Sequence, residues 1–276
     1  MPNFFGRGEE LGAARAILRR TRATGTGAVI AVTGEAGIGK TALITELRQW
    51  AAGDGFATGH EAAQESGNIA PLAPLLTALR SGPAPVLSQA DFGALAAHAA
   101  LPIWLVDRLT DQLRARATVT PILICVEDLQ WADAVTRYAL RVLPAQLVSS
   151  PIAWLLSSRL PIDALADDVA VHAIPLGPLP LSVAGAGGNP LLAVALAQGR
   201  LTEAVRHMLS ALPPAAMKLL STAAALGPSS TVDSLGAPPD RHALARLVRE
   251  GFLADDGERL HFRHELLRQV LLIWMD

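Results

Sequence analysis

The chain has 276 residues, of which 51% are apolar and 17% are charged, so it can bury a sizeable core and form one large or two to three small domains. The formal net charge is −2 and no basic block occurs, which excludes the electrostatic footprint of a general nucleic-acid binder. The single cysteine, Cys125, lies in an apolar run and cannot form an internal disulfide, so we expect a buried core thiol in a reducing cytoplasm.

The sequence predicts neither a secretion signal at its beginning nor a membrane span further along. Residues 1–7 lack the long apolar core of a signal peptide. The stretch 142–157 comes nearest to a membrane span but is interrupted by Pro144 and Pro151, so we expect a soluble protein. Apolar residues at helical spacing predict a first helix over 8–22.

A phosphate-binding motif follows the first predicted strand, over 27–33, and precedes a predicted helix over 41–51. The stretch Gly34-Glu35-Ala36-Gly37-Ile38-Gly39-Lys40-Thr41 matches the P-loop pattern G-x-x-x-x-G-K-[ST]. Its glycines let backbone N–H groups wrap an anion, Lys40 brings a positive charge to the terminal phosphates, and the Thr41 hydroxyl can ligate Mg²⁺. The start of the helix, which includes Ala42, adds its positive dipole end. These residues predict binding of a nucleoside triphosphate.

The middle of the chain alternates strands and helices. A second strand is predicted over 56–60, helices near 72–80, 90–99 and 102–116, and further strands over 122–126, 152–159 and 169–174. The near-continuous apolar runs are typical of central strands in a parallel sheet covered on both faces. The fold class is therefore α/β, a P-loop NTPase with flanking helices, with its ligands at the carboxyl ends of the strands.

Charged residues follow two of these strands. Glu127 and Asp128 form the Walker B pair that a P-loop needs: one carboxylate holds Mg²⁺ through water and the other polarises the attacking water. Arg159 ends the next strand and can sense the γ-phosphate by charge-assisted hydrogen bonds, although a solvated surface Arg is the alternative. Asp133 is expected to cap the following helix.

The composition changes after about residue 180, and small residues form a joint over 184–188. Asn189-Pro190 is typical of the N-cap and first residue of a helix. Helices are predicted near 191–198, 202–211, 214–226, 231–236 and 240–250, then a hairpin with its turn over 255–257, and a last helix after His264. Taken alone, His264 is more often structural. The pattern predicts three domains: the nucleotide-binding domain over 1–180, a small helical lid over 181–212 and a winged helix over 213–276.

Together the motifs resemble a known family. They comprise Phe5-Gly6-Arg7-Gly8-Glu9-Glu10-Leu11, the P-loop, Val126-Glu127-Asp128-Leu129-Gln130-Trp131-Ala132-Asp133, Arg159, Gly188-Asn189-Pro190 and Phe262-Arg263-His264-Glu265-Leu266-Leu267-Arg268. In this order they are similar to the nucleotide-binding module of STAND-class, AAA-like signalling ATPases. The closest resemblance is to the large ATP-binding transcriptional regulators of the LuxR type in bacteria, and it covers nearly the whole chain.

The resemblance implies a molecular switch with slow ATP hydrolysis. ADP holds a closed monomer, and ATP with an inducer opens the module so that it self-associates. Gly6 and Arg7 would line the adenine site with Phe5 nearby, Pro190 would pack over the adenine, and His264 would contact the β-phosphate of ADP. Such a contact gives the two nucleotide states the different affinities that a switch requires.

Three departures from the family pattern affect these expectations. The acidic pair is Glu-Asp where Asp often comes first, so the metal contact of Glu127 can be less direct. Residues 176–188 leave little room for the usual lid helices, so either the lid is reduced or residues are omitted, and we favour omission. The family also carries a helical-repeat sensor and a C-terminal helix-turn-helix, and the chain ends at Asp276 without them, so we expect either an excised module or a protein that acts without its own DNA reader.

Three other functions remain as alternatives. A working AAA-type ATPase, a motor or a loader of proteins on DNA, would need an arginine finger in trans, for which the candidates are Arg108, Arg114, Arg116 and Arg137. A winged-helix DNA binder would use the helix over 240–250, whose Arg residues are offset by acidic neighbours. A phosphoryl-transfer kinase is disfavoured because nothing marks an acceptor pocket.

Overall fold

The computed structural model describes residues 6–64, 70–82, 85–96, 102–162, 169–180, 183–236 and 240–275. Its contacts divide the chain into two compact units. The first, here the sheet unit, comprises Met1–Thr33 and Lys40–Pro175, and the second, the helical unit, comprises Gly34–Gly39 and Leu176–Asp276. Phe5, predicted to lie near the adenine, falls outside the described residues.

The sheet unit is built on a five-stranded sheet in which every neighbouring pair is parallel. Its strands are β1 (Ala28–Thr33), β2 (Ala57–Ala62), β3 (Ile122–Glu127), β4 (Ile152–Ser158) and β5 (Val171–Pro175), in the order β2-β3-β4-β1-β5. The predicted α/β class with a parallel sheet is confirmed. Because β3, β4 and β1 are neighbours, the residues that follow them meet at one edge, with Thr33 opposite Ser158.

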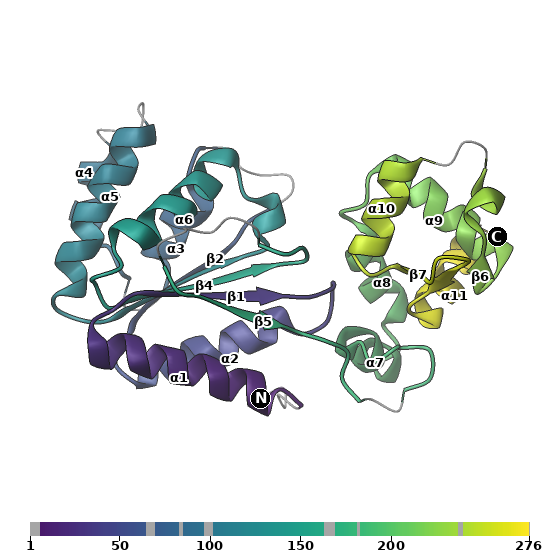
Figure 1. The fold of residues 1–276 in the computed structure, drawn as a ribbon, viewed down its shortest axis with the longest axis horizontal. Coiled ribbons are helices and arrows are strands. Elements are labelled where there is room, and N and C mark those ends of the chain that lie inside the picture. Colours follow the sequence, from purple (N-terminus) through teal and green to yellow (C-terminus); the bar gives the residue numbers. More distant parts are fainter. Residues whose placement is uncertain are drawn as a thin grey trace. The chain divides into compact units, whose positions relative to one another are not determined.

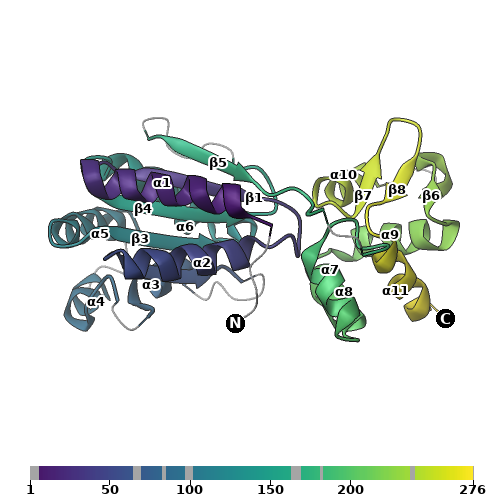
Figure 2. The ribbon, with the colours of Figure 1, turned by 90° about the horizontal axis from the view of Figure 1, so that it is seen from below.

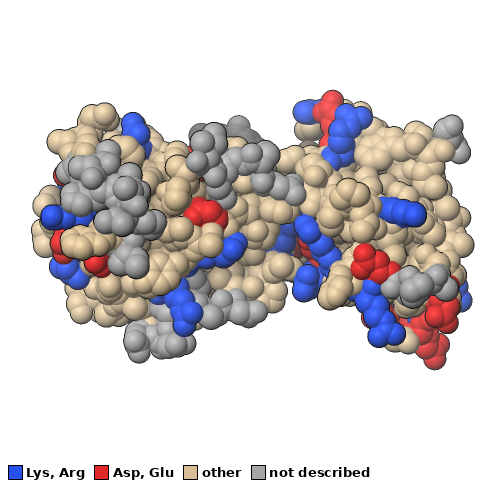
Figure 3. Space-filling view, turned by 90° about the horizontal axis from the view of Figure 1, so that it is seen from above, with Lys and Arg blue, Asp and Glu red and all other residues tan. Residues whose placement is uncertain are grey.

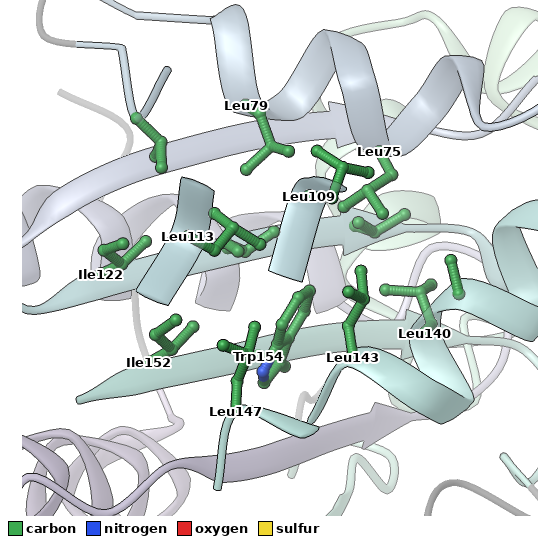
Figure 4. Close-up of a cluster of buried hydrophobic side chains, with 14 of the residues drawn as sticks. Leu75, Leu79, Leu109, Leu113, Ile122, Leu140, Leu143, Leu147, Ile152 and Trp154 are labelled. Carbon is green, nitrogen blue, oxygen red and sulfur yellow. The ribbon is translucent and has the colours of Figure 1, made fainter. Parts of the chain in front are cut away.

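Helices cover both faces of this sheet (Figures 1 and 2). α1 (Gly8–Thr24) and α2 (Lys40–Gly53) lie on one face, and α3 (Ala73–Arg80), α5 (Pro102–Ala117) and α6 (Ala134–Gln146) on the other, with α4 (Gln89–Ala96) against α5. Figure 4 shows the face of the sheet that α3, α5 and α6 cover. There the buried Trp154 of β4 lies among leucines from α6 and isoleucines of the strands. Burial on both faces explains why β3 and β4 carry almost no polar residues before their ends.

Cys125 lies in the middle of β3 and is buried, as predicted. Burial raises the pKa of its thiol far above the ordinary range. A nearly uncharged thiol in an apolar core is chemically inert, so this cysteine serves packing.

The helical unit combines helices with a small antiparallel sheet. Its helices are α7 (Pro190–Ala197), α8 (Leu201–Leu209), α9 (Pro214–Leu226), α10 (Arg241–Arg249) and α11 (Glu265–Met275). Its strands are β6 (Ser229–Ser230), β7 (Leu253–Asp255) and β8 (Leu260–Phe262), in the order β6-β8-β7. Phe252, Leu220, Leu247 and Leu267 are fully buried in a core of its own.

Two features of this unit differ from the sequence prediction. The helix predicted over 231–236 is wrong: Val232–Leu235 forms a short 3-10 turn, η2, closed by reciprocal hydrogen bonds between Thr231 and Ser234. The strand β6 was not predicted, because two residues are too few to show alternation. The expected hairpin therefore has a third strand beside it.

No helix in the part of the chain that the structure describes is long and apolar enough to cross a membrane.

Candidate functional site

The carboxylate of Glu127 lies at the carboxyl edge of the sheet. Glu127 is the last residue of β3 and is only 2% exposed. The Thr41 hydroxyl, one residue into α2, donates a 2.6 Å hydrogen bond to its Oε2. The final residue of the P-loop motif and the first residue of the Glu127-Asp128 pair are therefore in direct contact.

The other oxygen of Glu127 is held by a residue that the sequence analysis missed. His60 on β2 places its Nε2 2.6 Å from Glu127 Oε1. β2 pairs with β3 such that Ala62 lies opposite Glu127, and His60, two residues earlier, projects from the same face. Each oxygen of this buried carboxylate thus has a partner, which a buried carboxylate requires.

Thr41 and Glu127 together fit a magnesium ion. Both offer oxygen atoms, the ligands that Mg²⁺ prefers, and they are close enough to share one ion. Mg²⁺ in nucleotide sites uses one or two protein oxygens and takes the rest from phosphates and water. When bound, Mg²⁺ would neutralise charge on the phosphate oxygens.

The second Walker B carboxylate, Asp128, lies just beyond the strand in a strained conformation. Its φ of 54° and ψ of 48° are left-handed, a region that costs a residue other than glycine about 1–3 kcal/mol. Its backbone N–H donates to Ser157 Oγ on β4 at 3.3 Å. The turn aims the Asp128 side chain away from the direction that a continued strand would give it.

A glutamine connects Asp128 to the end of the next strand. Gln130 Nε2 donates to Asp128 Oδ1 at 2.8 Å, and Gln130 Oε1 accepts the backbone N–H of Arg159 at 3.1 Å. The Arg159 guanidinium lies over the Trp131 ring, 5.9 Å from its centroid. The Arg159 backbone is therefore linked to Asp128 through Gln130, while the contact of its guanidinium with Trp131 was not predicted.

Asp133 caps α6, as predicted. Its Oδ1 accepts the backbone N–H groups of Val135 and Thr136 at 3.0 and 2.9 Å. Burial acts to raise the pKa of Asp133, but the hydrogen bonds from Thr136, Leu72 and Val135 outweigh it and hold the pKa below its ordinary value.

In the helical unit, the glycine-rich part of the P-loop contacts the start of α7. The fully buried Asn189 donates from Nδ2 to the Ala36 carbonyl at 2.8 Å, and the Leu191 N–H donates to the Gly37 carbonyl at 3.2 Å. Asn189 Oδ1 also caps α7, with Pro190 as the first helical residue, as predicted. Gly37 has φ 79°, and a Cβ there would lie 2.8 Å from Asn189 Oδ1, so only glycine fits.

Glu35 of the P-loop contacts both residues that precede α11. His264 Nε2 lies 3.1 Å from Glu35 Oε1, and an Arg263 guanidinium nitrogen lies 3.4 Å from Oε2. His264 is 2% exposed and Glu35 is largely buried. Burial acts to raise the pKa of Glu35, but the hydrogen bond and charge of His264, together with Arg263 and Asn189, hold it below its ordinary value.

The backbone of the helical unit makes room for this contact at Gly251 and Gly187. A Cβ at Gly251, which has φ 82°, would lie 2.6 Å from Glu35 Oε2. A Cβ at Gly187 would lie 2.7 Å from His264 Nδ1. Both glycines are needed so that the chain can approach the Glu35–His264 pair closely.

The predicted adenine residues are described separately in the two units. Arg7 is buried at the start of α1, where it forms a 3.0 Å ion pair with Glu10, and Gly6 has φ 76° beside it. Pro190 begins α7 in the helical unit. The structure brings Thr41 to Glu127 and links Asp128 to Arg159 through Gln130.

Three contacts were not predicted, for different reasons: those of His60 with Glu127, of Gln130 with Asp128 and Arg159, and of Glu35 with His264. A polar residue in a short strand gives a weak signal until the order of the strands is known, and His60 is of this kind. Gln130 lies within the Walker B string, where its type offers both a donor and an acceptor, so it could have been singled out. The Glu35–His264 pair joins residues 229 positions apart that carry no shared pattern.

The parallel sheet, the glycine-rich loop after β1, and the Thr41–Glu127 contact define a P-loop nucleoside triphosphatase fold. The AAA ATPase domain matches residues 3–155, more than half of the chain, and the chain belongs to this family. No curated protein sequence matches the chain.

Two solved structures share its fold over nearly the whole length. The Walker-type ATPase PABY2304 of Pyrococcus abyssi is 14% identical with a TM-score of 0.61, and the match covers 98% of this chain and 96% of that one. The ORC2 protein of Aeropyrum pernix, solved as ADPNP and ADP complexes, is 16% identical with a TM-score of 0.52 over 99% and 96%. At such identities the similarity establishes the fold alone.

A STAND protein with a tetratricopeptide repeat sensor from Pyrococcus horikoshii also matches. It is 15% identical with a TM-score of 0.42, and the match covers 98% of this chain and 42% of that one. A TM-score this low carries no argument about the function of the chain.

Proposed function

We propose that the chain is an ATP/ADP-binding regulatory switch module that hydrolyses ATP slowly. The contact of Glu35 with His264 and Arg263 carries this proposal. It ties the loop that would hold the phosphates to the residues just before α11. A change of nucleotide at the loop therefore acts directly on the C-terminal helices, which is the coupling that a switch needs.

His264 has two competing acidic partners in this proposal. Its Nε2 faces the Glu35 carboxylate, and the family resemblance assigns it to the β-phosphate of ADP. Both partners are anionic and both belong to the P-loop region, so His264 can pass from one to the other. The histidine then ties residues 213–276, which we propose to be a winged helix, to the ADP state.

The chemistry of hydrolysis is assigned to the P-loop and to residues at the carboxyl ends of β3 and β4. The Glu127 carboxylate and the Thr41 hydroxyl would hold Mg²⁺ through their oxygens, and Asp128 orients the attacking water and accepts its proton. Lys40 and the Arg159 side chain neutralise charge on the phosphates, with Glu35, Ala36, Gly37, Ile38, Gly39 and Ala42 contributing backbone N–H groups. The nucleotide complexes of the Aeropyrum pernix ORC2 protein support ATP and ADP as the ligands.

The remaining assignments follow the family resemblance. Arg7 and Pro190 frame the adenine, with α7 and α8 as a reduced lid. In this proposal the ATP state self-associates and the protein acts in the cytoplasm. As in the family, an inducer would be recognised by a separate sensor domain and DNA by a separate helix-turn-helix domain.

Nucleotide binding and turnover by the purified chain test the proposal. The switch predicts co-purified ADP, tight binding of a fluorescent ADP analogue, and turnover well below about 1 s⁻¹, at the bottom of the usual enzyme range. Lys40→Ala should abolish binding, and Asp128→Asn should keep binding while it lowers hydrolysis. Rapid turnover without retained nucleotide would refute the switch, and binding by the Lys40→Ala variant would refute the P-loop assignment.

A working AAA-type ATPase is the second candidate, because a Walker-type ATPase and an ORC2 protein are among the solved structures that match along nearly their whole length. That function requires assembly with ATP alone. Sedimentation of the chain with ATP, without inducer, distinguishes the two: a stable ring indicates the working ATPase and a monomer indicates the switch.

Direct DNA binding is less well supported. On α10, Arg246 forms a 2.6 Å ion pair with Glu250, which reduces the charge available to phosphates. On the face drawn in Figure 3, Lys and Arg lie in small groups among Asp, Glu and uncharged residues. A tight, salt-sensitive gel shift on promoter DNA would reverse this view.

A further inference from the structure

The side chain of Gln130 makes two hydrogen bonds that lead to opposite sides of the proposed hydrolytic centre. Its Nε2 lies 2.8 Å from Asp128 Oδ1, and its Oε1 lies 3.1 Å from the backbone nitrogen of Arg159. Asp128 follows β3 and Arg159 follows β4, so one amide bridges the ends of two neighbouring strands.

The polarity of this bridge is fixed by its partners. An ionised carboxylate only accepts hydrogen bonds, and a backbone N–H only donates. Gln130 must therefore point its NH₂ group toward Asp128 and its carbonyl toward Arg159. A side chain that bridges these two partners must donate a hydrogen bond to one and accept a hydrogen bond from the other. The amide of glutamine does both, and its side chain is long enough to contact both partners.

The backbone around Gln130 holds the amide in place. Leu129–Trp131 forms a short 3-10 turn, η1, in which the Asp128 carbonyl accepts the Trp131 N–H at 2.8 Å and the Leu129 carbonyl accepts the Ala132 N–H at 3.1 Å. Asp128 itself has the left-handed backbone described above. A carboxylate on a strained turn needs side-chain support to keep one orientation, and Gln130 supplies a bond to one of its oxygens.

We propose that Gln130 is a positioning residue for ATP hydrolysis. It orients the Asp128 carboxylate, and it holds the backbone at Arg159, here called the Arg159 turn, at a fixed position relative to that carboxylate. This inference rests on the proposed function, in which Asp128 handles the attacking water. Through the bridge, any shift of the Arg159 turn reorients the carboxylate, so phosphate sensing and water activation are coupled by one side chain. Gln130 contacts neither reactant in this role and acts only through Asp128 and Arg159.

Two substitutions separate the halves of the bridge. Gln130→Met keeps the length of the side chain and removes both hydrogen bonds. Gln130→Glu keeps an acceptor for the Arg159 N–H and loses the donor to Asp128. Gln49→Met, at an exposed position on α2 in the same unit, is the matched control for the glutamine-to-methionine change.

The first measurement needs no nucleotide. Amide hydrogen exchange at Arg159 should be faster by about tenfold in Gln130→Met and unchanged in Gln130→Glu and Gln49→Met, because exchange reports the local loss of the bond. Equal exchange in wild type and Gln130→Met would overturn the bridge to Arg159.

The second measurement is steady-state ATP hydrolysis with the affinity for a fluorescent ATP analogue. Both Gln130 variants should lower kcat by about 10- to 100-fold, since a small misplacement of a catalytic group costs this much, and leave KM and the analogue Kd within about twofold. Gln49→Met should match wild type. An unchanged kcat in Gln130→Met would overturn the proposal, as would a loss confined to KM. If wild type itself neither binds nor hydrolyses ATP, the proposed function fails, and the exchange measurement decides whether Gln130 bridges the two strands.

Discussion

His60 and Glu127 lie on neighbouring strands, and their side chains meet with His60 Nε2 2.6 Å from Glu127 Oε1. Glu127 is 2% exposed, so this contact supplies half of the hydrogen bonding of a buried carboxylate, and Thr41 supplies the other half. The contact fixes which Glu127 oxygen faces Thr41. A carboxylate that is held in this way offers a defined oxygen to a metal ion.

We predict that removal of His60 leaves Glu127 with an unsatisfied buried oxygen. His60→Ala should lower the free energy of unfolding by about 1–3 kcal/mol, the typical cost of such a group. The measurement is urea unfolding followed by tryptophan fluorescence, with EDTA and without nucleotide, so that only the protein contact is tested.

A double-mutant cycle tests whether the two residues act as a pair. Removal of the carboxylate in Glu127→Ala should make the His60→Ala change nearly neutral, so the two effects are not additive. Additive effects would mean that the two side chains do not interact in solution.

The capping residue Asp133 provides a prediction about stability alone. Asp133→Ala removes the acceptor for two N–H groups at the start of α6 and should cost about 0.5–2 kcal/mol. Asp133→Asn keeps a good capping oxygen and should cost less. Thermal unfolding of both variants measures the difference, and equal losses would show that the negative charge of Asp133, rather than its capping geometry, matters.

The fold of the sheet unit could be predicted because its strands are apolar and bounded by clear breaks. β3 and β4 are buried on both faces, so their sequences are continuous apolar runs that end in polar residues. The P-loop motif follows the first strand, so it identifies the edge of the sheet at which the ligand binds. Glu127, Asp128 and Arg159 follow other parallel strands and were therefore predicted to lie near that edge.

The contacts that orient these groups could not be predicted from the same patterns. His60 reaches Glu127 only because β2 pairs with β3 in one register, and a shift by one residue would turn it to the other face. Glu35 meets His264 because Gly251 and Gly187 allow the backbone to approach, which is a property of folded geometry. A helix was predicted at Val232–Leu235, and these four residues form a 3-10 turn instead.

The lowered pKa of Glu35 predicts how stability depends on pH. A carboxyl group whose pKa is lower in the folded than in the unfolded chain stabilises the fold above its ordinary pKa of 4.5. This stability is lost as the pH falls below 4.5 and through the folded-state pKa. Glu35→Gln should therefore lose less stability than wild type between pH 7 and pH 3, measured by urea unfolding at each pH. Parallel pH profiles for the two proteins would show that the ion pairs of Glu35 with His264 and Arg263 do not form in solution.

His264 should control how long ADP stays bound. In the proposed switch it lies beside the P-loop carboxylate of Glu35 and grips the β-phosphate in the ADP state. His264→Ala should speed the release of a fluorescent ADP analogue by about tenfold, as expected for one charge-assisted hydrogen bond of about 1.4 kcal/mol. His261→Ala, an exposed histidine on β8, is the matched control and should release ADP at the wild-type rate. Glu35→Gln distinguishes the two partners of His264: it removes the carboxylate that competes for the histidine, so ADP release should slow. If His264→Ala leaves ADP release unchanged while it still destabilises the fold, His264 serves only to hold Glu35, and the coupling of nucleotide to the C-terminal helices must lie elsewhere.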